Sequence, residues 1–125
     1  TGSCMVALGM GIAGVMGRDE AWVREVREAG LERGEELWPL PLYGEYRKLI
    51  EHPHADLNNI GGKWGGALTA GLFLDRFVPA EVKWAHCDIA GPAIRTDGWR
   101  CYARGMTAFG TRTLIRLAQR LAGRA

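Results

Sequence analysis

The segment from Val82 to Ala93 most constrains how this chain can fold. Between Val82 and Ile89 the residues on both alternating sides are mostly apolar. One side carries Val82, Trp84 and His86, and the other carries Ala85, Cys87 and Ile89. A strand with few solvent-facing positions belongs in the middle of a sheet that helices cover on both faces. The segment therefore predicts an α/β fold in which this strand is central.

The residues that follow this strand are small: Ala90-Gly91-Pro92-Ala93. In open α/β sheets, ligands bind in the crevice at the carboxyl ends of the strands. Small side chains allow a ligand to come close to the backbone. We therefore expect Ala90 to Ala93 to form one wall of a binding site.

Length and composition indicate one globular domain or part of a larger one, since the chain has 125 residues of which 47% are hydrophobic. The formal charge of +2 is too small to favour nucleic acid as a partner. Three cysteines are an odd number, which fits reduced thiols in a cytoplasmic protein. We expect no membrane span and no signal peptide. The first residue is Thr rather than Met, so we expect a cleaved chain or a piece of a longer one.

Near the amino terminus, the apolar run from Ser3 to Leu8 predicts another buried strand. The glycine-rich stretch from residue 9 to 17 contains the spacing G-x-G-x-x-G. A dinucleotide site would also need a helix opening inside this motif and an acidic residue about 20 positions later at a strand end. Neither is evident, so we expect a tight loop here.

Helices are predicted over residues 19–33, 43–51, 65–77 and 111–121, with an extended segment at 38–42 and a loop at 94–109. In the last helix, the expected buried stripe is Leu114, Leu117, Ala118 and Leu121. Its other face carries Arg112, Arg116, Arg120 and Arg124, which we expect to be solvated, with DNA contact as the alternative.

Two polar segments lie between these helices. His52-Pro53-His54 is expected to be a surface turn rather than a pair of metal ligands. Asp56, Asn58 and Asn59 can hydrogen-bond to nearby backbone and hold an irregular loop in one shape.

Five ordered motifs give the chain a resemblance to the leucyl aminopeptidases, which are two-metal exopeptidases. Residues 1–9 look like the end of the family's T-L-T-G-A-x-x-x-A-L-G segment, and residues 34–42 resemble G-E-x-x-W-x-L-P-L. Residues 55–59 match A-D-x-x-N, residues 84–91 match W-A-H-x-D-I-A-G, and residues 105–114 match G-x-T-x-x-x-x-R-T-L. The resemblance covers the chain nearly end to end.

This resemblance implies a three-layer α/β/α sandwich with a central mixed, mostly parallel sheet. The chain would supply only the carboxyl-terminal part of that sandwich, so residues 1–125 would be a single, incomplete catalytic domain. The implied activity is release of amino-terminal residues from peptides, with two divalent metal ions, Mn or Zn, and a bicarbonate as the implied cofactors. The implied assembly is a cytoplasmic homo-hexamer that takes peptide substrates.

The family's metal-binding and catalytic residues, including the segment N-T-D-A-E-G-R, precede the part that this chain matches. The chain contains no such segment, so we expect it to hold no metal ligand and no catalytic residue. An amino-terminal remainder of the same protein would carry them. The resemblance assigns substrate contact to Gly2, Ala90 and Ala93. The family often has Met where this chain has Ala93, which predicts a roomier pocket.

By the same resemblance, Asp56, Asn58 and Asn59 would hold the residues around the substrate in position without touching the substrate themselves. His86 and Asp88 would be structural, because their strand is buried.

Two other functions stay open at this point. A chain without metal ligands could be a non-catalytic assembly subunit or a DNA-binding subunit derived from the same family. Alternatively, Thr1 could be an amino-terminal nucleophile activated by its own amine, at the start of a strand formed by Ser3 to Leu8.

Overall fold

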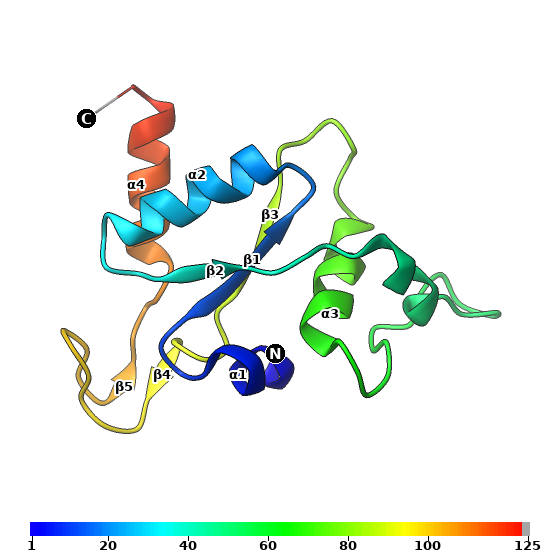
Figure 1. Ribbon diagram of the computed structural model, residues 1–125, viewed down its shortest axis with the longest axis horizontal. Helices are drawn as coiled ribbons and strands as arrows, with labels where there is room; N and C mark the ends of the chain where they lie inside the picture. The colour runs from blue at the N-terminus through cyan, green and yellow to red at the C-terminus, as the bar shows by residue number, and fades with distance from the viewer. Residues whose placement is uncertain (124–125) are drawn as a thin grey trace.

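Helices flank both sides of a three-stranded sheet in the computed structural model, which describes residues 1–123 (Figure 1). The strands are β1 (Ala13–Gly17), β2 (Leu37–Pro39) and β3 (Ala85–Asp88), in the spatial order β2-β1-β3. β1 runs parallel to β2 and antiparallel to β3. The sheet is therefore mixed, and the predicted α/β class is confirmed.

Side chains of β1 alternate between two helical layers. Helices α2 (Glu20–Leu31) and α4 (Thr111–Leu121) lie on one side of the sheet, and α1 (Gly2–Leu8) and α3 (Gly66–Asp75) lie on the other (Figure 1). On the first side, the buried residues form one cluster: Ala13, Val15, Val23, Val26, Ala29, Leu37, Phe109 and Leu117. These three layers match the predicted α/β/α sandwich.

Glycines bring α1 and α3 close to the second face of the sheet. A Cβ atom added to Gly71 of α3 would lie 2.3 Å from Sδ of Met16, which is on β1. A Cβ atom on Gly14 would lie 3.0 Å from Sγ of Cys4, which is on α1. Side chains at these two positions would force Met16 and Cys4 to move or push α3 and α1 away from the sheet, so the glycines allow the close packing.

The structure corrects two expectations near the amino terminus. Residues 3–8 belong to helix α1, not to a strand. The hydroxyl oxygen of Thr1 caps this helix by accepting a hydrogen bond from the backbone N of Cys4 over 3.0 Å. The glycine-rich stretch is a loop only in its first part, because residues 13–17 form β1.

Within residues 1–123 the middle strand is β1, whereas the sequence favoured β3. β3 is shorter than predicted and pairs with β1 alone. The outer edge of β2 is blocked. The backbone N of Leu40 donates to the carbonyl of Val15 over 2.8 Å, so its neighbours Pro39 and Pro41, which have no N–H, face away from β1. A further strand could therefore be added beside β3 but not beside β2.

The other elements largely follow the sequence. Asp19 caps α2 by accepting a hydrogen bond from Ala21 N over 2.8 Å, and Gly34 takes the left-handed conformation with φ of 71°. Residues 44–50 form the 3-10 helix η1 (Gly44–Ile50). The expected loop at 94–109 contains a short pair of strands, β4 (Ile94–Arg95) and β5 (Gly105–Met106). No helix in the described part of the chain is long and apolar enough to cross a membrane.

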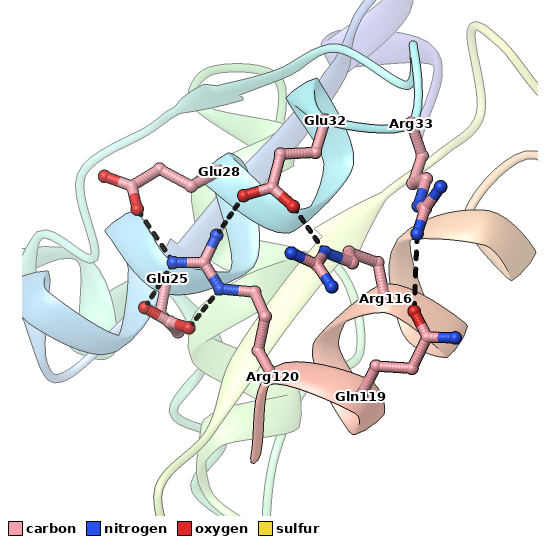
Figure 2. Close-up of polar contacts among 7 residues, drawn as sticks. All are labelled: Glu25, Glu28, Glu32, Arg33, Arg116, Gln119 and Arg120. Atoms are coloured by element: carbon pink, nitrogen blue, oxygen red, sulfur yellow. Dashed lines mark hydrogen bonds and ion pairs between the residues drawn. The ribbon is translucent and has the colours of Figure 1, made fainter. Parts of the chain in front are cut away.

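Helix α4 is oriented differently from the prediction. Its arginines face α2, where Arg120 contacts Glu25 at 2.6 Å, Glu28 at 3.1 Å and Glu32 at 2.8 Å, and Arg116 contacts Glu32 (Figure 2). Leu114 and Leu121 are each 65% exposed. The prediction that these arginines are solvated is therefore wrong for Arg116 and Arg120, because α2 presents a row of glutamates to them. Arg124 lies outside the described residues.

Candidate functional site

The carboxyl end of β3 lies beside the start of α1. The hydroxyl of Thr1 donates a hydrogen bond to Oδ2 of Asp88 over 2.6 Å. Oδ1 of the same carboxylate accepts a hydrogen bond from the backbone N of Ala90 over 3.3 Å. Asp88 thus joins the segment that contains Gly2 to the segment that contains Ala90. The structure brings these two predicted substrate-contacting residues into one region.

Close backbone contact reinforces this junction. A Cβ atom on Gly91 would lie 2.3 Å from the carbonyl oxygen of Gly9, which follows α1. At Gly2 the opposite holds, since an added Cβ atom would meet nothing within 4 Å. Gly91 is needed for packing, whereas Gly2 faces open space. An open backbone position fits the expectation that a ligand approaches there.

The turn that carries Ala93 is held at several points. Ala93 N donates to the carbonyl of Ile89 over 3.0 Å, and the carbonyl of Ala93 accepts from Thr107 N over 3.1 Å. The hydroxyl of Thr107 also donates to the carbonyl of Pro92 over 2.6 Å. Thr107 therefore fixes the turn that carries Ala93, one of the residues predicted to contact the substrate. The sequence marked Thr107 only as part of a motif and did not assign it this role.

Burial and hydrogen bonding set the charges in this region. Burial raises the pKa of Asp88, and hydrogen bonds from the hydroxyl of Thr1 and from Ala90 N oppose this by favouring the carboxylate. Burial lowers the pKa of His86 and raises that of Cys87 to about 11. At neutral pH the site therefore holds one carboxylate beside a neutral imidazole and a neutral thiol.

His86 and Cys87 do not form a catalytic pair. They are consecutive residues of β3, so their side chains point to opposite faces of the sheet. Cys87 packs against the core between the sheet and α2. This arrangement fits the structural role expected for His86.

The residues present do not fit a metal centre by themselves. Nowhere in residues 1–123 do three or more His, Cys, Asp or Glu side chains come together in a way that could hold a metal ion. The His52-Pro53-His54 segment is a turn, in which His54 N donates to Nδ1 of His52 over 3.0 Å.

Asp56, Asn58 and Asn59 lie away from the junction. Asp56 lines a cavity of about 440 Å³ together with Phe73 and Arg76 at the end of α3. Asn58 fastens its loop to η1, because its side-chain Nδ2 donates to the carbonyl of Glu51 over 2.9 Å. Asn59 is exposed. Their supporting roles stay predictions, and only the loop-holding role of Asn58 corresponds to a contact seen here.

With this geometry in place, the chain can be compared with known proteins. Residues 1–115 match the model of the cytosol aminopeptidase family, catalytic domain. The chain belongs to the cytosol aminopeptidase family. Similar curated proteins include the probable cytosol aminopeptidase of Persephonella marina, 49% identical over 115 residues that make up 91% of this chain and 23% of that protein. The one from Geobacter sulfurreducens is 47% identical, with 92% and 23% covered.

Solved structures agree with this membership. The bottromycin maturation enzyme BotP in complex with Mn has a TM-score of 0.92 and 34% identity, covering 98% of this chain and 27% of that one. A tomato leucine aminopeptidase mutant has a TM-score of 0.85 and 38% identity, covering 96% and 23%. The resemblance seen in the motifs is confirmed. The chain spans about a quarter of the length of the relatives it matches.

Proposed function

We propose that this chain is part of a leucyl-type metallo-aminopeptidase that releases amino-terminal residues from peptides. The observation that carries the proposal is the match of residues 1–115 to the catalytic domain of this family. The hydrogen bonds of Asp88, which join the segment of Gly2 to the segment of Ala90, support a common role for these residues. Gly2 offers its backbone to the substrate, and Ala90 and Ala93 line the pocket for the substrate's first side chain. The rigid turn held by Thr107 keeps that wall in place.

The two divalent metal ions, Mn or Zn, and a bicarbonate would be held by residues outside this chain. The Mn complex of the similar enzyme BotP supports this proposal. The contribution of this chain is to shape and fix the substrate pocket.

The surfaces of the chain support a larger assembly. Among the described residues β3 pairs with β1 alone and has a free edge, while Pro39 and Pro41 block the other edge of the sheet. The amino-terminal remainder of the protein would extend the sheet beside β3. Exposed Leu114, Ile115 and Leu121 on α4 give an apolar surface for contact between subunits of a homo-hexamer.

Alternatives have less support in this geometry. The DNA-binding reading depended on the arginines of α4, but Arg112, Arg116 and Arg120 all contact glutamates. The nucleophile reading placed Thr1 at the start of a strand, whereas Thr1 caps a helix and its hydroxyl is bonded to Asp88.

The decisive experiment combines mass and activity. The purified protein is analysed by intact mass spectrometry and assayed on leucine p-nitroanilide with and without manganese. A longer protein, or a co-purifying partner chain, with manganese-dependent release of leucine supports the proposal. This chain alone in the sample, with no turnover, would instead favour the non-catalytic assembly subunit.

A further inference from the structure

A concave site lies at the end of the strands opposite to the Asp88 junction. β3 is antiparallel to β1, so Gly17 at the carboxyl end of β1 pairs with Ala85, the first residue of β3. The carboxyl ends of the parallel strands β1 and β2 therefore lie together at this end of the sheet. Open α/β sheets bind ligands at the carboxyl ends of their strands. A groove of about 780 Å³ opens there, between α2 and the segment of residues 39–44 that follows β2.

Arginines dominate the lining of this groove, which carries Arg18, Arg24, Arg27 and Arg47 but only one acidic residue, Glu20. Two of the arginines have structural partners. Nε of Arg18 contacts Oδ1 of buried Asp75 at 2.5 Å, and Nη2 of Arg47 contacts Oδ2 at 2.8 Å. Asp75 is thus fully engaged, and the charges of Arg24 and Arg27 are not balanced by it.

Arg24 and Arg27 are free to receive a ligand. Within residues 1–123, Arg24 makes no ion pair or hydrogen bond. Arg27 uses only Nε, which donates to the carbonyl of Leu37 over 3.3 Å, and its guanidinium lies 5.5 Å from the ring centroid of Trp38. These contacts orient Arg27 and leave its two terminal nitrogens available. The two residues are three positions apart on α2, which puts them on neighbouring parts of one helix face.

The wall opposite the arginines is largely apolar and contains Pro41, Leu42 and Tyr43. The ring of Tyr43 packs edge-on against Tyr46, with 4.9 Å between centroids, which restrains its position. Pro39 and Pro41 also restrict this segment, because their rings fix the backbone angle φ. An apolar wall facing a few polar groups, at a volume of several hundred Å³, is typical of sites for small organic ligands.

We propose that this groove binds a small ligand that carries a carboxylate or phosphate on an apolar body. The planar guanidinium groups of Arg24 and Arg27 grip the oxyanion, whose geometry suits them. Pro41, Leu42 and Tyr43 contact the apolar body. The site is separate from the wall formed by Gly2, Ala90 and Ala93, and it does not depend on the aminopeptidase activity proposed above.

Isothermal titration calorimetry on the purified protein tests this site with four probes. N-acetyl-leucine presents a carboxylate on an apolar body, and phenyl phosphate presents a phosphate on one. N-acetyl-leucinamide has the first body without the charge, and inorganic phosphate has the charge without a body. We expect at least one of the two complete probes to bind more tightly than both partial probes, and the better of the two identifies the anion.

Variants then assign the binding to the groove. Arg24→Gln and Arg27→Gln should each weaken the better probe about tenfold or more, because each removes a charge-assisted hydrogen bond. Arg27→Lys keeps the charge but loses the planar fork and should also bind more weakly. Arg104→Gln removes an exposed arginine that has no partner in the described part of the chain, and it should bind like the wild type.

Arg24 is exposed and unpartnered, so Arg24→Gln should fold normally, which circular dichroism checks. Absence of binding by both complete probes overturns the proposal. Equal affinity for N-acetyl-leucine and its amide, with no binding of phenyl phosphate, overturns it as well. So does undiminished affinity of the better probe in the Arg24→Gln and Arg27→Gln variants.

Discussion

Asp88 accepts a hydrogen bond from the hydroxyl of Thr1 over 2.6 Å, although the two residues are separated by 87 positions in the sequence. The same hydroxyl accepts a hydrogen bond from Cys4 N and so begins helix α1. One side chain at the end of β3 therefore determines where α1 starts and where Gly2 lies. The wall of the proposed pocket depends on this contact.

Replacing Asp88 with alanine should destabilise the protein. The carboxylate is 3% exposed, and its removal leaves the partly buried N–H of Ala90 and the hydroxyl of Thr1 without their acceptor. Loss of hydrogen bonds to a charged group costs roughly 1–3 kcal/mol. Urea denaturation should show a loss of that order, and amide exchange at Cys4 and Ala90 should accelerate. Asp97→Ala removes an exposed carboxylate and should have little effect, so equal stability of the two variants would contradict this role.

Glu35 is expected to stabilise the start of α4, as Asp88 stabilises the start of α1. It is 1% exposed, and its Oε2 accepts hydrogen bonds from N and Oγ1 of Thr113 over 2.8 and 2.6 Å. Gly110, at the start of α4, has no side chain to cap the helix, so Glu35 supplies the missing acceptor. Glu35→Gln should lower the free energy of unfolding by roughly 1.5–3 kcal/mol, because the hydrogen bonds from Thr113 would then go to a neutral amide instead of a carboxylate.

The neighbouring residue provides the control for Glu35. Glu36 contacts Arg100 at 3.7 Å with a side chain that is 41% exposed. Glu36→Gln should change stability by less than about 1 kcal/mol, because exposed ion pairs contribute little. Chemical denaturation of both variants checks the difference. Similar losses for the two would show that Glu35 does not cap α4.

The three thiols should differ sharply in reactivity. Burial raises the pKa of Cys87 to about 11 and also raises that of Cys4, and Asp88 adds to the effect at Cys4. The thiolate is the reactive form, so at pH 8 iodoacetamide should label exposed Cys101 first. Peptide mapping by mass spectrometry measures this order, and Cys101→Ser should abolish the fast labelling. Labelling of Cys87 as fast as that of Cys101 would contradict the burial of β3.

The raised pKa of Cys87 also predicts that the stability of the protein depends on pH. The pKa of Cys87 is higher in the folded chain than the ordinary thiol value of 9.0, so the folded state keeps its proton when the unfolded state loses it. This contribution to stability is complete below pH 9 and declines as the pH rises toward 11. In Cys87→Ala, the decline measured by thermal unfolding over this range should be smaller.

Capping residues and glycines in the local sequence were enough to predict some elements of the fold. Helix α2 begins after the capping residue Asp19 and ends before Gly34, so the sequence gives both its limits. The apolar run at residues 3–8 is too short to distinguish a helix from a strand, and the cap at Thr1 depends on a contact with distant Asp88.

Long-range relationships were beyond the reach of such signals. The orientation of α4 follows from the row of glutamates on α2, and no local pattern in α4 reveals that partner. The direction of β3 relative to β1 is equally invisible in either strand alone. The family resemblance pointed to Gly2, Ala90 and Ala93 as substrate contacts, and this assignment stays a prediction. Only the structure shows that Asp88 joins two of them and that Thr107 holds the third.

Ala93 provides a test of the proposed substrate pocket. In the proposed aminopeptidase, a methionine at this position would fill space that the alanine leaves open. Ala93→Met should therefore lower kcat/KM for phenylalanyl and tryptophanyl substrates relative to leucyl substrates. The change in this ratio should be roughly 10-fold or more, since a methylene in an apolar pocket is worth about 1–3 kcal/mol of discrimination. Steady-state kinetics on the corresponding p-nitroanilides measure this ratio.

The control is Ala103→Met, at an exposed position of the loop between β4 and β5, which should leave the ratio unchanged. If Ala93→Met also leaves it unchanged, Ala93 does not line the pocket.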